Sequence, residues 1–138
     1  MGLVSWWQNR RAKELQRTYD ELSAEFFETY TRLKHQFYEL KEDISKRLGI
    51  DIVFAKRNQF YETYQRFLKV LEDLISIDKR WRDIDSKMEY LFGRGMTYLF
   101  KHGSNFDYDR ALSTLNSMET SLNNVEVLLD KLELRTAA

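Results

Sequence analysis

The sequence predicts an all-α fold, and three of its features lead to that prediction. Apolar side chains recur every three or four residues over most of the chain, the spacing of one apolar face on an α-helix. The chain has no proline, a residue that interrupts helices because it lacks an amide donor. Its 138 residues suffice for one domain to bury a core without disulfides. We therefore expect a single helical domain of long helices and short loops.

The first helix is expected over residues of about 4–48. Its apolar residues are all three or four apart: Leu15, Tyr19, Leu22, Phe26, Tyr30, Leu33, Phe37, Leu40, Ile44 and Leu48. Gly49 can take the left-handed position that ends a helix, and Asp51 can cap the next one. Since so short a loop separates the two helices, they should form an antiparallel hairpin.

The second helix is expected over about 52–92, followed by a kink at Gly93 and Gly95 and a short turn over about 96–101. Its seam has a spacing close to that of a coiled coil: Phe60, Tyr64, Phe67, Leu71, Leu74, Ile77, Trp81, Ile84, Met88 and Leu91. A second row, with residues seven apart, consists of Tyr61, Leu68 and Ile75. A helix with two apolar stripes should contact more than one neighbour.

A third, shorter helix is expected over about 107–134, capped by Ser104, Asn105 or Asp107. Its apolar residues follow nearly strict heptads: Leu112, Leu115, Met118, Leu122, Val125, Leu129 and Leu132. The predicted architecture is thus a long antiparallel hairpin plus a shorter third helix, similar to a three-helix bundle or coiled coil.

The lengths of these helices suggest that the tip of the hairpin is uncovered. If the second helix ran on to residue 92, the third could cover it only from about residue 74 onward. The tip is rich in large apolar groups, which form the predicted self-association or partner surface: Phe37, Tyr38, Phe54, Phe60, Tyr61, Tyr64 and Leu68. We expect a homodimer that completes a four-helix bundle. The alternative is a bent first helix or a longer third one, so that one chain covers its own tip.

The N-terminal segment combines indoles with cations. Trp6 and Trp7 are followed by Arg10, Arg11 and Lys13, with no acidic residue before Glu14. This composition is typical of a surface that contacts an anionic membrane or a protein partner. The alternative is that the tryptophans pack internally, against Leu91, Phe92 and Met96.

No pattern for catalysis, metal binding or a cofactor is found. His35 and His102 lack the helical spacing of zinc or di-iron ligands, and there is no cysteine for thiol chemistry or disulfides. Paired carboxylates such as Glu42–Asp43 are neighbours on a helix and do not face each other. The sequence therefore predicts a protein that is not an enzyme and needs no cofactor.

The best functional interpretation is a helical protein–protein interaction module: an adaptor, an assembly or chaperone-like factor, or a regulator, which acts through homo-oligomerisation and apolar helical faces. One alternative is a peripheral membrane protein that uses the N-terminal tryptophans and arginines. The other is a nucleic-acid accessory protein, which is disfavoured because 22 basic residues are balanced by 22 acidic ones. The apolar stretch Leu3–Trp7 is too short for a signal peptide or a membrane span, and without cysteine nothing argues for an oxidising compartment. We therefore expect a cytoplasmic location, with membrane-peripheral attachment as the variant.

Overall fold

The computed structural model describes residues 2–101 and 105–135, except for the side chains of residues 2–4, 6 and 7. In this part of the chain every regular element is a helix, so the predicted all-α class is confirmed. The elements are α1 (Gly2–Ser45), α2 (Ile50–Ile77), α3 (Trp81–Lys87), the π-helix η1 (Met88–Gly93), α4 (Arg94–Lys101) and α5 (Tyr108–Lys131).

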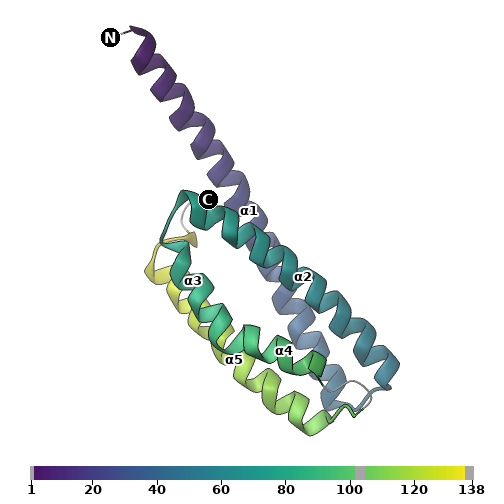
Figure 1. Cartoon of the computed structure of the whole chain (residues 1–138). Coiled ribbons are helices and arrows are strands. Elements are labelled where there is room, and N and C mark those ends of the chain that lie inside the picture. Colours follow the sequence, from purple (N-terminus) through teal and green to yellow (C-terminus); the bar gives the residue numbers. More distant parts are fainter. Residues whose placement is uncertain (1, 102–104, 136–138) are drawn as a thin grey trace.

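The chain crosses the length of the molecule four times (Figure 1). α1 and α2 run in opposite directions and pack along each other, α3, η1 and α4 then form one continuous segment, and α5 returns beside it. α5 packs against α1 as well as against α3, η1 and α4. The first part of α1 projects beyond the other helices, and Tyr19 is the first buried residue among those of its side chains that are described.

The turn between α1 and α2 places an arginine where the sequence suggested a glycine. Arg47 has a φ of 54°, whereas Gly49 has a φ of −53° and precedes α2 as its N-cap. The Leu48 N–H donates to Asp43 O at 3.1 Å and the Arg47 N–H to Ile44 O at 3.0 Å, the two bonds of a Schellman motif. Arg47 also pairs with Asp109 of α5 and lies over the Tyr108 ring, contacts that fix it in this conformation.

The expected helix over 52–92 is divided among α2, α3 and η1, because the chain turns back at Asp78–Arg80. Asp78 is extended, and its carboxylate accepts from the Arg80 N–H at 3.1 Å, as the side chain of an N-cap does. Its other partner is the Tyr19 hydroxyl, which donates at 3.1 Å and accepts from Trp81 Nε1 at 3.0 Å. Since Trp81 is completely buried, this chain of hydrogen bonds joins the break to the core.

The break should depend on the charge of Asp78. We expect Asp78→Ala to lower the free energy of unfolding by about 1–2 kcal/mol at neutral pH, since it removes the acceptor of the Arg80 N–H. The Arg80 side chain holds the pKa of the Asp78 carboxyl below its usual range. The stabilisation is therefore complete above the unfolded-state pKa of about 3.9 and is lost as the pH falls through the lower folded-state value.

Urea denaturation at neutral and acidic pH tests this prediction. The difference in the free energy of unfolding between wild type and Asp78→Ala should be smaller at acidic pH than at neutral pH. Asp83→Ala is the control, because Asp83 is an exposed carboxylate in the first turn of α3. If Asp78→Ala lowers the free energy of unfolding by the same amount at both pH values, the ionised carboxylate does not stabilise the turn.

The early turn also changes which part of the hairpin is covered. Because α2 ends at Ile77, the segment from α3 to α4 runs back along the hairpin and α5 follows it. Phe37 and Phe60 are completely buried, and both pack against the ring of Phe92 in η1, with centroids 6.0 and 5.6 Å apart. The length argument for an uncovered tip therefore does not hold for this chain.

Two glycines allow close packing around the π-helical turn. A Cβ at Gly93 would lie 3.2 Å from the Tyr64 hydroxyl of α2. A Cβ at Gly95 would overlap Met118 of α5. The chain stays helical through both glycines, so they permit contact with neighbouring helices and do not end the helix.

Candidate functional site

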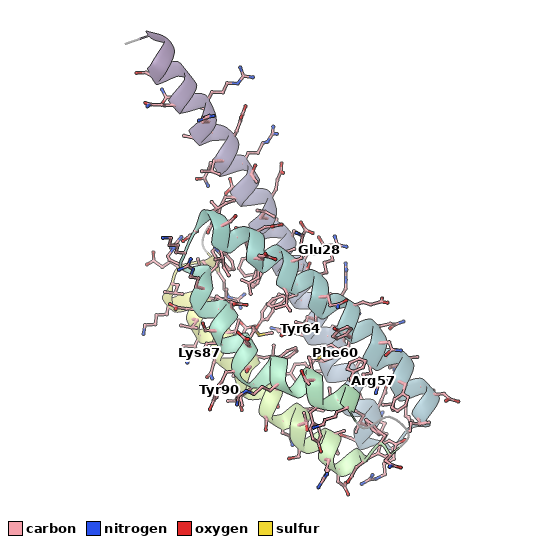
Figure 2. The ribbon with its side chains drawn as sticks, viewed as in Figure 1. Glu28, Arg57, Phe60, Tyr64, Lys87 and Tyr90 are labelled. Carbon is pink, nitrogen blue, oxygen red and sulfur yellow. The ribbon has the colours of Figure 1, made fainter. Side chains whose placement is uncertain are left out.

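An open groove lies between α2 and the segment formed by α3, η1 and α4. We call it the α2–α4 groove, and its volume is about 1320 Å³. Figure 2 labels Arg57, Phe60 and Tyr64 along α2 and Tyr90 on the opposite segment. The groove exceeds the volume of about 300–1,000 Å³ that is usual for a small-molecule site. Its size and openness suit a segment of polypeptide better.

The α2 wall of the groove is formed by the second apolar row. Tyr61, Leu68 and Ile75 all line the groove. The sequence predicts that this row contacts a second neighbour. Within the chain, the opposite segment covers the row only in part. Tyr61 packs on Phe100 of α4, with ring centroids 4.9 Å apart, yet remains 39% exposed. Leu68 and Ile75 are half-buried.

The opposite wall comes from α3, η1 and α4. Tyr90, which lies in η1, is 62% exposed and lines the groove. Met96 and Phe100 of α4 add apolar surface. A π-helix is rare and often found at functional sites, and here it contributes Glu89, Tyr90 and Gly93 to the groove.

The groove is bounded where α2 and α4 meet near the hairpin tip. Arg57 of α2 donates from Nη1 to Leu99 O of α4 at 3.1 Å. Its guanidinium lies between two aromatic rings, 4.1 Å from the centroid of Phe54 and 4.2 Å from that of Phe100. Burial lowers the pKa of this guanidinium. At the other end the groove is bounded by the turn at Asp78–Arg80, which joins α2 to α3.

The two ends of the groove carry opposite charges. Glu72 of α2 and Asp85 and Glu89 of the opposite segment lie toward the α2–α3 turn, and Arg94 and Lys101 lie farther along, toward the hairpin tip. Among the residues that the structure describes, none of the three carboxylates has an ion-pair partner. Within the described residues, no ion pair neutralises the acidic end.

Two groups at this end of the groove have raised pKa values, with burial as the largest cause. Burial and, next, the charge of Glu89 raise the pKa of the Asp85 carboxyl. Burial, followed by the charges of Asp85 and Glu89, raises the pKa of Tyr64 to about 12. Asp85 and Glu89 are four residues apart on one helical face, so their repulsion would fall if a cation bound between them.

The predicted surface residues divide among several environments. Tyr61, Tyr64 and Leu68 line the groove. Phe37 and Phe60 are core residues, as described above. Phe54 is half-buried against Phe106, with ring centroids 5.5 Å apart. Tyr38 is 44% exposed and lies beside Glu119 of α5, outside the groove; burial and a hydrogen bond to Glu119 raise its pKa.

The sequence reasoning missed Asp85, Glu89 and Tyr90. The one available signal was the spacing of the two carboxylates, which puts like charges on one helical face. Their position opposite Tyr61 and Leu68 could not be inferred, because it depends on the turn at Asp78.

The predicted N-terminal contact lies on the projecting part of α1. Arg10, Arg11 and Lys13 are exposed there, and Arg10 pairs with Glu14 at 3.4 Å. The side chains of Trp6 and Trp7 lie outside the described residues. Phe92, which had been considered as a packing partner for them, contacts Phe37 and Phe60 in the middle of the molecule.

The described residues hold no group of three or more His, Asp or Glu side chains that could bind a metal ion. His35 is exposed beside Glu39, 3.6 Å away, and His102 lies outside the described residues. Among the described residues, no helix has both the length and the apolarity needed to cross a membrane. No protein-family model, curated protein or solved structure matches this chain.

Proposed function

We propose that this protein is a non-enzymatic interaction module that binds an amphipathic, cationic α-helix in the α2–α4 groove. The observation that carries the proposal is the combination of two incomplete apolar walls with three carboxylates, Glu72, Asp85 and Glu89, that form no ion pair among the described residues. Binding an amphipathic helix in an apolar groove is a common mode of peptide recognition. The lack of cysteine supports a cytoplasmic location for such a module.

The dimensions of the groove favour a helix over a small ligand. From Tyr61 to Ile75, the α2 wall extends over about 20 Å, or four helical turns. Apolar residues of a bound helix, spaced by three and four, would pack between Tyr61, Leu68 and Ile75 on one side and the opposite wall on the other. The bound helix would then cover the second apolar row of α2, which the chain itself covers only in part.

The charges favour one kind of helix. A cation near Asp85 and Glu89 would relieve their repulsion and remain partly shielded from water, where an ion pair is worth more than at an open surface. An acidic helix would add to the repulsion. The groove should therefore discriminate by charge as well as by apolar contact.

Isothermal titration calorimetry with two synthetic peptides tests the proposal. Both form an amphipathic helix with leucine on one face, flanked by lysine in the first peptide and by glutamate in the second. We expect the lysine peptide to bind and the glutamate peptide not to. Leu68→Glu should weaken binding of the lysine peptide at least about tenfold, because it introduces a charge into the apolar wall.

Val127→Glu is the matched control, since Val127 is 64% exposed on α5 and does not line the groove. It should bind the lysine peptide as tightly as wild type does. If both peptides bind with equal affinity, or if Leu68→Glu and Val127→Glu weaken binding of the lysine peptide equally, the peptide does not recognise the groove.

A further inference from the structure

We propose that the projecting part of α1, residues 2–18, occupies the α2–α4 groove of a second copy of the chain, so that two chains exchange these segments reciprocally. This inference rests on the proposed function, because it identifies the helix that the groove binds. It uses two surfaces of the chain: the groove and the projecting helix, whose described side chains are all exposed.

The first argument is the exposure of the projecting segment. Every side chain from Gln8 to Thr18 is exposed, although α1 remains helical throughout. Leu15 is 54% exposed. By sequence the same segment also carries two indoles, Trp6 and Trp7. Among the described side chains of this segment, none is buried against another helix of the chain.

The second argument is charge. Residues 2–18 hold four basic residues, Arg10, Arg11, Lys13 and Arg17, and one acidic residue, Glu14. The groove presents Glu72, Asp85 and Glu89, which have no ion-pair partner in the described part of the chain. The segment therefore has the charge that the acidic end of the groove selects.

The third argument is length and direction. Residues 2–18 form a helix of about 25 Å, which is close to the length of the α2 wall. α1 continues without interruption from this segment into the part packed on α2 and α5, and the segment points away from the rest of the molecule (Figure 1). It cannot reach the groove of its own chain without breaking α1, whereas it can reach that of another copy.

Reciprocal exchange would also close the assembly. Two chains related by a two-fold axis would each donate one segment and each provide one groove. Both exposed surfaces would then be covered in a dimer, and no further copies would be required.

A charge-swap experiment with the full-length chain tests the inference. The groove variant carries Asp85→Lys and Glu89→Lys, and the segment variant carries Arg10→Glu and Arg11→Glu. Sedimentation equilibrium should show a wild-type dimer at about 100 µM. Each variant alone should have a dimer dissociation constant raised at least about tenfold, since like charges then meet in both grooves.

The equimolar mixture of the two variants should regain the dimer. In a mixed dimer, the basic segment of the groove variant meets the acidic groove of the segment variant, and the acidic segment meets the basic groove. This recovery also shows that both variants are folded. The control Glu28→Lys/Glu62→Lys changes the net charge as the groove variant does, at exposed positions outside the groove, and should dimerise like wild type.

A wild-type monomer at this concentration, or a mixture that stays monomeric, would overturn the exchange. In a dimer the partner's segment would compete with the lysine peptide, so the two proposals are separated on monomeric protein. If wild type is monomeric and binds the peptide in calorimetry, the exchange fails and the proposed function stands; if the monomer does not bind the peptide either, both fail. Flotation of monomeric wild type with anionic phosphatidylserine vesicles, abolished in the segment variant, would assign residues 2–18 to a membrane surface and likewise overturn the exchange.

Discussion

Trp81→Ala is expected to lower the free energy of unfolding by about 3–5 kcal/mol. Trp81 is the largest of the completely buried side chains, and its ring lies edge-on to Phe26, with centroids 4.7 Å apart. Its removal leaves a cavity at the point where the chain turns from α2 into α3. It also removes the donor to the Tyr19 hydroxyl. A loss of this size is a large part of the total stability of an average domain, about 5–15 kcal/mol.

Trp81→Phe separates the two contributions, because phenylalanine keeps an aromatic ring but has no N–H donor. It should cost about 1–2 kcal/mol, mainly for the hydrogen bond to Tyr19. Urea denaturation followed by far-ultraviolet circular dichroism measures both variants. If Trp81→Ala lowers the free energy of unfolding no more than Trp81→Phe does, the packing of Trp81 does not hold the turn in place.

Gly95→Ala is expected to lower the free energy of unfolding by about 1–3 kcal/mol through overpacking. A Cβ at this position would overlap Cγ and Sδ of Met118, which is completely buried, and would lie 3.3 Å from Cγ2 of Thr114. α4 and α5 would have to separate, or Met118 would have to leave its position. On an open helix the same change would stabilise by about 1 kcal/mol, because alanine is the better helix former.

A double-mutant cycle with Met118→Ala isolates this contact. Truncation of Met118 makes room for the new methyl group, so Gly95→Ala should cost at least about 1 kcal/mol less in that background. Denaturant midpoints of the four proteins give the coupling. If the two substitutions are additive, the close approach of α4 and α5 at Gly95 is not what the glycine provides.

The helical class could be predicted because it depends on local periodicity. The spacing of apolar residues from Tyr19 to Ile44 identifies α1 without any knowledge of its neighbours. Asp107 was one of three candidate caps, and the structure identifies it as the one that caps α5: its side chain accepts from the Asp109 and Arg110 N–H groups. A side chain that bonds backbone groups two and three residues away leaves its signal in the sequence.

The turn at Asp78 could not be predicted, since neither glycine nor proline marks it and the apolar spacing continues through it. The chain turns there because Asp78 bonds Arg80 locally and Tyr19 of a distant helix, while Trp81 enters the core. Tertiary contacts of this kind override helix propensity.

The groove exists because the chain turns at Asp78, so it could not be predicted from the sequence either. Tyr61, Leu68 and Ile75 were recognised as a second apolar row, but what faces them depends on the path of the chain after Ile77. Arg47 shows the same limit on a smaller scale, because its contacts with α5 let it adopt the positive φ that the sequence assigned to Gly49.

The most direct test of the α2–α4 groove as a binding surface is a methyl NMR titration with the lysine peptide. We expect the largest shift changes at Leu68, Ile75 and Met96, which line the groove from both walls. Ile52 and Val127, exposed at 49% and 64% and outside the groove, should not shift. Shifts confined to Ile52, Val127 or the projecting part of α1 would contradict it.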